Sequence, residues 1–464
     1  MDAYQPYLLP AICLVWCIAG LLTVVWPDKA LEKRLSARKE TADSDIGTAP
    51  SDSEIARLRR RIRMTAGVWC AVGLCGVLMT GLVAGVVRNL NGSGPGVRSA
   101  KFETFLIEYA RHARRETGVV GMVVGAVAGD EVGLVGVGQK TVTDPTPPDG
   151  DTVYEIGSIS KVFTGLLLAD AVERGEATLD SRVQEYLPDG VSLPADIRDT
   201  ITLRHLTTHS SGFPRLPANF ASAINAVQIT FGGDPHRRYV VEQFHEAVRT
   251  VELEFEPGSQ SVYSNFGVSL LGEVLATRAG QPYEQLMQMR VAQPLGMTST
   301  AVKLDDAMRS RLAPGYRSVL QLGPGQLALK SATWDMPDHY AGAGGIRSTG
   351  KDMLRFLQAN MGKLDSSLAP AMSASHEALM QMEPSLAIGM NWLRRTRDGL
   401  GPVVLWHNGA TGGYRSFLAF TEDGRFGVVV LANTAVPLDD VAVDLLEVIE
   451  QDYLTWFDRD DADQ

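Results

Sequence analysis

Cysteine is scarce in this chain of 464 residues: there are only four, Cys13, Cys17, Cys70 and Cys75. The sequence beyond residue 75 therefore has no disulfide, and cysteine chemistry gives no indication of whether this part is exported. Positive charge is also in deficit. The formal net charge is -11 at pH 7, and this acidity argues against nucleic acid as a partner of the larger, C-terminal part of the chain.

Motifs for a metal ion or a phosphate group are lacking as well. His205 and His209 are four residues apart, but no Glu stands beside His205 as in His-Glu-x-x-His. The Ser-Ser-Gly-Phe-Pro that follows His209 is typical of a helix end. The glycines at Gly342 to Gly345 are not followed by the Lys-Ser/Thr pair of a phosphate-binding loop. We therefore expect no metal and no cofactor.

Apolar residues are concentrated near the N-terminus, in two nearly uninterrupted runs at residues 8–26 and 64–87. Each run is long enough to cross a hydrocarbon core of roughly 30 Å as a helix. A signal peptide is the alternative for the first run, but the residues before it include Asp2 and no Lys or Arg. We predict transmembrane helices within residues 1–27 and 64–87.

The segment between these runs, residues 28–63, is basic near both ends. Its Lys and Arg residues predict that it stays in the cytoplasm by the positive-inside rule. Its centre, residues 41–53, has too little apolar content to fold and is predicted to be disordered. The chain after residue 87, beginning with a short linker at 88–98, would then lie on the periplasmic or extracellular side, with membrane lipid as a partner.

Residues that carry chemistry lie further along. Ser158 and Lys161 are one helical turn apart, so a hydroxyl and an amine share one helix face. An extended run precedes Ser158 and an apolar helical face follows it. We therefore predict Ser158 at a helix N-terminus, where backbone N–H groups favour an oxyanion. Apolar neighbours would lower the pKa of Lys161 toward neutrality, and the pair predicts an activated nucleophile.

In isolation, Ser-x-x-Lys is better explained by a helix cap followed by a solvated lysine. Two later segments, Tyr263-Ser-Asn265 and His407-Asn-Gly409, distinguish this pair. A Tyr near a turn is commonly a core aromatic with its hydroxyl bonded, so Tyr263 gains its interest from its place in Tyr-Ser-Asn.

With these segments in view, residues from about 100 to 455 resemble the serine hydrolases related to class C β-lactamases and penicillin-binding proteins. Further similar stretches lie at residues 202–214, 255–267, 294–297, 342–350 and 406–433. The resemblance implies an α/β fold of the β-lactamase/penicillin-binding-protein type over residues 99–457. In that fold an antiparallel sheet flanked by helices is joined to an all-α subdomain.

The family's functional residues can be placed on this sequence. The resemblance implies that Ser158 is the acyl-accepting nucleophile, Lys161 its base partner and Tyr263 the second acid/base group. The implied substrate-binding residues are Asn265, His407, Gly409 and Ala410. Backbone N–H groups of Ser158 and Ala410 would form the oxyanion hole.

One position departs from the family pattern. β-Lactamases and peptidoglycan-directed members usually carry Lys-Thr-Gly or Lys-Ser-Gly where this chain has His407-Asn408-Gly409. A permanent cation is replaced by an imidazole that is mostly neutral at pH 7. This change favours uncharged esters or amides over β-lactams. Arg415 is an alternative partner for a carboxylate, although a structural role is the more common one for such an Arg.

The hydrophobic pattern predicts the elements of this domain. A helix is expected at residues 100–115, followed by strands at 119–127 and 132–137. A mainly helical middle should extend to about residue 395. Strands are then expected at 403–406, 414–420 and 426–431, with a closing helix at 438–453. Strands at both ends of the domain indicate one sheet completed by the C-terminus, with the active site in a cleft beside the helical insert.

The function predicted is a membrane-anchored serine hydrolase that forms an acyl-enzyme. Its substrate would be a peptide or small molecule with an amide or ester bond, as for a peptidase, a D-amino acid amidase, an esterase or a prodrug-maturing peptidase. Two alternatives stay open. One is an acyltransferase that uses the same residues, and the other is a sensory or binding module without turnover.

Overall fold

The structure, a computed structural model, describes residues 95–220, 223–322, 325–397 and 401–457. The predicted membrane helices at 1–27 and 64–87 and the basic loop between them lie outside these residues. Among the described residues, no helix combines the length and the apolar character that crossing a bilayer requires.

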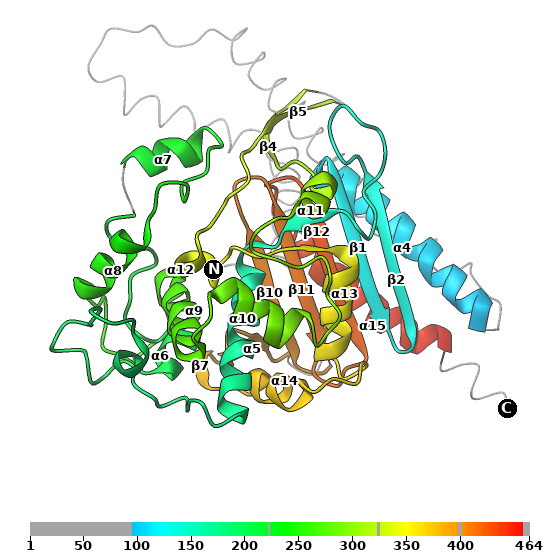
Figure 1. Cartoon of the computed structure of the whole chain (residues 1–464). Helices are drawn as coiled ribbons and strands as arrows, with labels where there is room; N and C mark the ends of the chain where they lie inside the picture. The colour runs from blue at the N-terminus through cyan, green and yellow to red at the C-terminus, as the bar shows by residue number, and fades with distance from the viewer. Residues whose placement is uncertain (1–94, 221–222, 323–324, 398–400, 458–464) are drawn as a thin grey trace, which may run out of the picture. The chain divides into compact units, whose positions relative to one another are not determined.

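The central sheet has eight strands in the order β2-β1-β12-β11-β10-β9-β8-β7, and each neighbouring pair is antiparallel (Figure 1). Its strands are β1 (Gly121–Ala128), β2 (Glu131–Gly138), β7 (Met380–Glu383), β8 (Leu386–Ile388), β9 (Leu393–Arg395), β10 (Val404–Ala410), β11 (Arg415–Thr421) and β12 (Phe426–Ala432). Because β1 pairs with β12, the two ends of the domain meet inside one sheet.

Helices cover both faces of this sheet. α4 (Pro95–Thr117) packs on β1 and β2, and α15 (Asp439–Phe457) packs on β11 and β12. α13 (Gly350–Asn360) packs on β1 and β12 from the other face (Figure 1). This double cover explains why β1 and β12 are buried along their whole lengths and are apolar without alternation.

The remaining helices form the helical part of the domain, around α5 and α9, which are buried along most of their lengths. They are α5 (Ser160–Glu173), α6 (Leu203–Thr207), α7 (Ala223–Thr230), α8 (Val241–Arg249), α9 (Asn265–Ala279), α10 (Tyr283–Met287), α11 (Asp306–Arg311), α12 (Asp338–Ala341) and α14 (Ala369–His376). Single turns lie at η1 (Gly157–Ile159), η2 (Val183–Tyr186) and η3 (Gln288–Ala292). α5 contacts α9, and this contact joins the nucleophile's helix to the helix that follows Tyr263.

Two small antiparallel pairs complete the described strands. β3 (Val153–Glu155) pairs with β6 (Arg347–Thr349), and β4 (Tyr316–Leu322) pairs with β5 (Gly325–Lys330). β3 leads directly into the turn that carries Ser158. The β3–β6 pair therefore ties the start of the nucleophile segment to the segment that precedes α13.

The expected strands and helices at the two ends of the domain are confirmed to within a few residues. Two expectations were wrong. The region up to residue 395 is not mainly helical to its end, because β7, β8 and β9 extend the sheet; strands of three or four residues give no readable alternation. The last residues of the predicted linker 88–98 are helical, because α4 begins at Pro95, where a proline is tolerated in the first turn.

Candidate active site

Ser158 lies in the turn η1, between β3 and α5. The turn is forced into close contact with β10. Gly157 adopts a φ of +50°, and a Cβ added there would stand 2.6 Å from the backbone nitrogen of Ala410. Only glycine fits this conformation and this approach without strain. The sequence therefore brings the Ser158 backbone beside Ala410, as the oxyanion-hole prediction requires.

The end of β10 is fastened to the same turn by a second contact. A Cβ on Gly409 would stand 2.0 Å from the carbonyl oxygen of Ile156. That oxygen also accepts a hydrogen bond of 2.7 Å from the Ser416 hydroxyl of β11. Gly409 is therefore a site of backbone approach, and the residues around Ser158 and Ala410 are held together by the sheet itself.

Lys161 lies in the first turn of α5 and is fully buried. Its Nζ is 3.1 Å from Ser158 Oγ and donates a hydrogen bond of 2.5 Å to the carbonyl oxygen of Ala343. Burial lowers its pKa well below the usual value, and the charge of Arg215 lowers it further. A neutral amine bound to one carbonyl keeps a lone pair that can accept the Ser158 proton.

Tyr263 also approaches Ser158 and Lys161, and it lies in the segment before α9. The Ser264 side chain caps α9 by accepting the Gly267 N–H, which fixes where this segment enters the helix. Lys161 Nζ lies 4.8 Å from the centre of the Tyr263 ring. Burial raises the pKa of Tyr263 to about 12, and a hydrogen bond with Ser158 opposes part of this shift. Tyr263 is therefore a neutral phenol at pH 7.

His407 of β10 lies close to Tyr263. Its side chain is buried, its ring centre lies 6.3 Å from that of Tyr263, and Nδ1 donates to the carbonyl oxygen of Asn408 at 2.7 Å. Burial, followed by the proximity of Lys161, lowers its pKa to about 3. The imidazole is accordingly neutral, as the sequence interpretation of His407 expected.

Asn265 is the first residue of α9, and its backbone N–H donates to the carbonyl oxygen of Arg215 at 3.0 Å. Within the described residues, its side-chain amide has no hydrogen-bond partner. Asn265 is partly exposed, so the amide is available to a substrate. The structure thus brings all seven predicted site residues to the junction of η1, α5, β10 and the start of α9.

Three further residues lie at this junction. Ala343 and Arg215 were not singled out from the sequence, and His209 was considered there only as a metal ligand. His209 is buried with a φ of +56°, its ring centre is 4.6 Å from that of Tyr263, and its Nδ1 accepts the Ser264 N–H at 3.2 Å. Each lies within a stretch that carried the family resemblance, at 202–214 or 342–350, or directly after it, and that was the available signal.

Arg415, the alternative carboxylate partner, has a structural environment. Its guanidinium donates to the carbonyl oxygens of Thr411 at 3.0 Å and Tyr414 at 2.9 Å. These bonds hold the loop between β10 and β11. The favoured interpretation of Arg415 as a structural residue agrees with these contacts.

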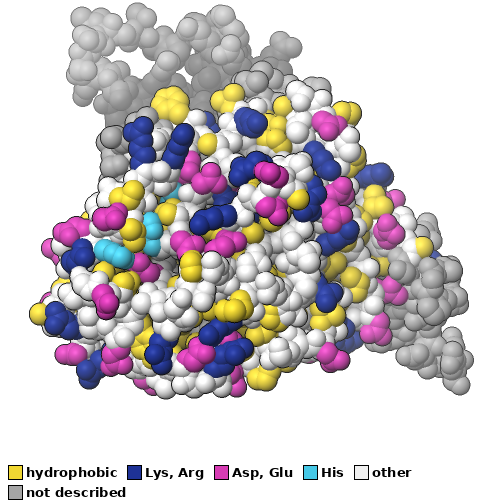
Figure 2. All heavy atoms as spheres, viewed as in Figure 1, with side chains coloured by type: hydrophobic (Ala, Val, Ile, Leu, Met, Phe, Trp, Pro, Cys, Tyr) yellow, Lys and Arg dark blue, Asp and Glu magenta, His cyan; other side chains and the backbone are white. Residues whose placement is uncertain are grey.

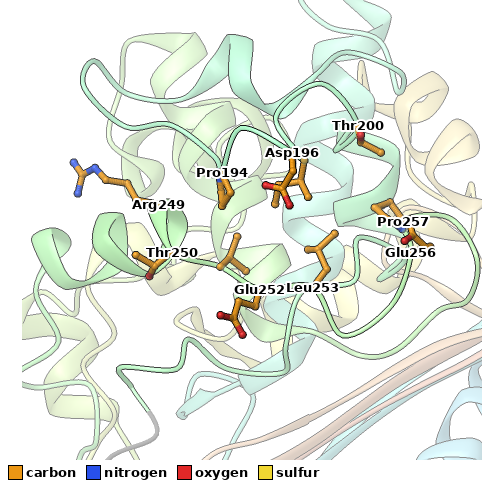
Figure 3. A pocket seen from close by; sticks show the side chains of 11 residues that line it. Pro194, Asp196, Thr200, Arg249, Thr250, Glu252, Leu253, Glu256 and Pro257 are labelled. Atoms are coloured by element: carbon orange, nitrogen blue, oxygen red, sulfur yellow. The ribbon is translucent and has the colours of Figure 1, made fainter.

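Metal-ligand clusters are absent from the residues that the structure describes. His205 has a local structural role instead, since its Nδ1 accepts the Thr202 N–H in a capping box at the start of α6. A surface cavity of about 610 Å³ opens elsewhere, lined by residues from Pro194 to Thr200 and from Arg249 to Pro257 (Figure 3). None of the predicted site residues lines it.

The family model described as Beta-lactamase matches residues 106–452 of this chain. The chain belongs to the β-lactamase family. Its similar relatives include the D-alanyl-D-alanine-carboxypeptidase/endopeptidase AmpH of Escherichia coli strain K12, 26% identical over 77% of this chain and 90% of AmpH. A β-lactamase of Pseudomonas fluorescens is 26% identical over 69% of this chain and 90% of that protein.

Solved structures agree on the fold. The β-lactamase/D-alanine carboxypeptidase of Yersinia pestis, complexed with citrate, matches with a TM-score of 0.63 at 22% identity, over 75% of this chain and 97% of that chain. A class C β-lactamase matches with a TM-score of 0.65 at 21% identity, over 78% and 98%. The predicted fold of an antiparallel sheet with helices is confirmed, and this member of the β-lactamase family is a serine hydrolase.

Proposed function

We propose that this β-lactamase-family protein cleaves an amide or ester bond through an acyl-enzyme on Ser158. The observation that carries the proposal is the 3.1 Å contact between Ser158 Oγ and the Lys161 amine, whose pKa burial lowers well below its usual value. In the first step, Oγ attacks the substrate carbonyl carbon and its proton passes to Lys161 Nζ. The backbone N–H groups of Ser158 and Ala410 would stabilise the oxyanion that forms.

Collapse of this intermediate breaks the bond between the carbonyl carbon and the leaving group. The leaving nitrogen or oxygen takes up a proton through Tyr263, which is neutral and hydrogen-bonded to Ser158. Water then attacks the acyl carbon and gives a proton to Lys161 and Tyr263. The bond between Ser158 Oγ and the acyl carbon breaks, Oγ takes a proton back from these groups, and the acid is released. The alternative of a binding module without turnover is less favoured, because a nucleophile in contact with a neutral base has no use in binding alone.

The substrates proposed are amides and esters of peptides or small molecules, with peptides placed first. The support is the relative named D-alanyl-D-alanine-carboxypeptidase/endopeptidase, which shares 26% identity over 77% of this chain. The neutral His407 in place of the usual Lys argues against a dedicated β-lactamase. Transfer of the acyl group to an alcohol or amine would use the same residues. When such an acceptor is added, the acylated acceptor would then form in place of the free acid.

Covalent labelling tests the nucleophile. A fluorophosphonate should add to the full-length protein at Ser158, and intact-mass analysis should show no adduct in Ser158→Ala. Ser348→Ala is the matched control, because Ser348 also precedes a Lys by three residues but bonds Thr300 at 2.7 Å, while Lys351 pairs with Asp151 at 2.6 Å. Labelling that survives in Ser158→Ala would exclude Ser158 as the nucleophile. A panel of peptide amides, simple esters and penicillins then ranks the substrate classes.

We also propose that helices within residues 1–27 and 64–87 anchor the enzyme in a membrane, with the hydrolase domain on the periplasmic or extracellular side. The support is the basic segment between two apolar runs. A reporter that works only outside the cytoplasm should be active when fused after Gly96 and inactive when fused near Ser51. The reverse pattern would overturn this topology.

A further inference from the structure

Burial disfavours the charged forms of the bases in the catalytic cluster. It lowers the pKa of Lys161, His209 and His407. Burial raises the pKa of Tyr263, which stays a phenol. Arg215 is different, because a guanidinium keeps its proton at any physiological pH. It is the permanent cation of this cluster among the residues that the structure describes.

Arg215 is held at the mouth of the site by its backbone. Its carbonyl oxygen accepts the N–H groups of Asn265 at 3.0 Å and Phe266 at 3.3 Å, so it is fastened to the first turn of α9. Its guanidinium carbon lies 5.0 Å from the centre of the Tyr263 ring. Lys161 Nζ lies 4.8 Å from the same centre. The Arg215 cation is thus as near to Tyr263 as the candidate base is.

The Arg215 guanidinium has no acceptor within the described part of the chain. The side chain is exposed, and neither a hydrogen bond nor an ion pair joins it to another described residue. Two other arginines differ from it: Arg415 bonds two carbonyl oxygens, and Arg290 contacts Glu176 at 2.7 Å. The contact with the Tyr263 ring occupies no carboxylate or carbonyl, so the N–H groups remain available to a ligand.

On the face drawn in Figure 2, Lys and Arg side chains alternate with Asp and Glu and do not form one basic field. The Arg215 guanidinium lies next to the ring of Tyr263, the second predicted acid/base group. Planar guanidinium groups bind carboxylates by two parallel hydrogen bonds, which gives both attraction and orientation.

We propose that Arg215 binds a carboxylate of the substrate, so that the preferred substrates carry a free carboxylate near the bond that is cleaved. This inference rests on the proposed acyl-enzyme function. It also changes the expectation drawn from His407 alone, which favoured uncharged substrates. His407 provides no cation on β10, and Arg215 provides one from the loop after α6, which is bonded to the first turn of α9.

Matched substrates test the proposal in the full-length protein. We would compare a 3-carboxyphenyl ester with the 3-carbamoylphenyl ester of the same acyl group, which differ in charge but little in size. The unmodified enzyme should prefer the carboxylate ester. Arg215→Gln should lower kcat/KM for that ester by roughly 10- to 100-fold, the range for loss of a charged hydrogen bond. The same substitution should change kcat/KM for the carbamoyl ester by less than about threefold.

Two further variants sharpen the result. Arg215→Lys keeps the positive charge but loses the planar group that can form two parallel hydrogen bonds. Its kcat/KM for the carboxylate ester should lie between the values of the unmodified enzyme and Arg215→Gln. Arg278→Gln is the matched control, because Arg278 is an exposed Arg over a different ring, 5.8 Å from the centre of Tyr186. It should leave the preference unchanged. Rising salt should weaken the preference of the unmodified enzyme, since the proposed contact is exposed.

The outcomes separate the two hypotheses. An equal fall for both esters in Arg215→Gln would overturn the inference and indicate that Arg215 acts on Tyr263 or on folding. No change for either ester would show that Arg215 is a solvated side chain, and this also overturns it. Failure of fluorophosphonate to label Ser158 in the unmodified protein would instead reject the proposed function. Retained labelling in Arg215→Gln shows that the variant is folded.

Discussion

The two sides of the candidate active site differ in charge and in exposure. The β10 side presents His407, which is buried and neutral, and a backbone that approaches the Ser158 turn closely. The side formed by the loop after α6 and the start of α9 presents Asn265, which is partly exposed, and Arg215, which is exposed. Neither side chain has a hydrogen-bond or ion-pair partner among the described residues. The functional side chain of the first side is buried and neutral, and those of the second side are exposed or charged.

This difference indicates a division of labour. A base that must take up a proton during a reaction benefits from burial when burial lowers its pKa toward the working pH, as it does for Lys161. A group that recognises a charged substrate must stay ionised and accessible. Lys161 has the first kind of environment and Arg215 the second. In the resembled family the cation usually lies on the β10 side, so this chain would have moved recognition to the opposite side while leaving the chemistry in place.

The largest effect on kcat/KM should come from replacing Ser158 or Lys161, the proposed nucleophile and its base. Ser158→Ala should lower kcat/KM on the order of 10⁴-fold or more, because no other group replaces the nucleophile. Lys161→Ala should cost a similar amount, and the double variant should be little worse than Ser158→Ala, since the two residues act as a unit. Steady-state kinetics of the three variants measures this. Multiplicative losses would mean that Ser158 and Lys161 act independently, and the proposed base would be wrong.

Tyr263 lies between the two sides of the site. The variant Tyr263→Phe therefore tests whether substrate recognition and catalysis depend on separate residues. Tyr263→Phe keeps the ring under Arg215 but deletes the proton carrier, so kcat should fall by roughly 10²- to 10⁴-fold. The preference for a carboxylate ester over its carbamoyl twin should persist, because Arg215 is unchanged. Loss of that preference in Tyr263→Phe would show that recognition and chemistry are not separate.

The pH dependence of kcat/KM should identify which of the buried bases titrates during catalysis. Lys161 accepts a proton only when neutral, so kcat/KM should be highest above its lowered pKa and fall about tenfold per unit as the pH drops below it. Tyr263, with a pKa of about 12, should cause no loss at moderately alkaline pH. His407→Gln should keep the acid limb, because the pKa of His407 is about 3. Disappearance of the limb in this variant would assign it to the imidazole.

Much of this site was predictable because its residues lie in contiguous motifs. Ser158 and Lys161 are one helical turn apart, and Tyr263 stands beside a helix start, so local spacing located them. The role of Gly157 was not predictable, because its positive φ matters only through its approach to Ala410, 253 positions later. Arg215 was missed for a similar reason. Nothing in its own sequence neighbourhood shows that it stands over Tyr263 without a partner.

The same limit applies to the fold. The ends of the domain were predicted well, because α4, β1, β11 and β12 carry long apolar patterns. The strands β7 to β9 have three or four residues each, and their partners in the sheet, rather than their own pattern, determine their conformation.

Returning a cation to the β10 side would sharpen the comparison. His407→Lys should raise the ratio of kcat/KM for the carboxylate ester over its carbamoyl twin by up to about tenfold when combined with Arg215→Gln. Lys161 lies close enough to His407 to influence its pKa, so the added charge should also lower the pKa of Lys161 and shift the acid limb to lower pH. A double variant that regains no preference would mean that position matters as much as charge.

The smallest change in preference should come from Arg415, the other arginine near the site. Its guanidinium is committed to the carbonyl oxygens of Thr411 and Tyr414, in the loop directly after Ala410. Arg415→Gln should lower the free energy of unfolding by roughly 1 to 3 kcal/mol through the loss of these bonds. Both esters should slow to a similar degree, because the loop supports the predicted oxyanion hole and is indifferent to substrate charge. The ratio of the two kcat/KM values should therefore stay within about twofold of that of the unmodified enzyme. A ratio that collapsed in Arg415→Gln and persisted in Arg215→Gln would return recognition to the β10 side.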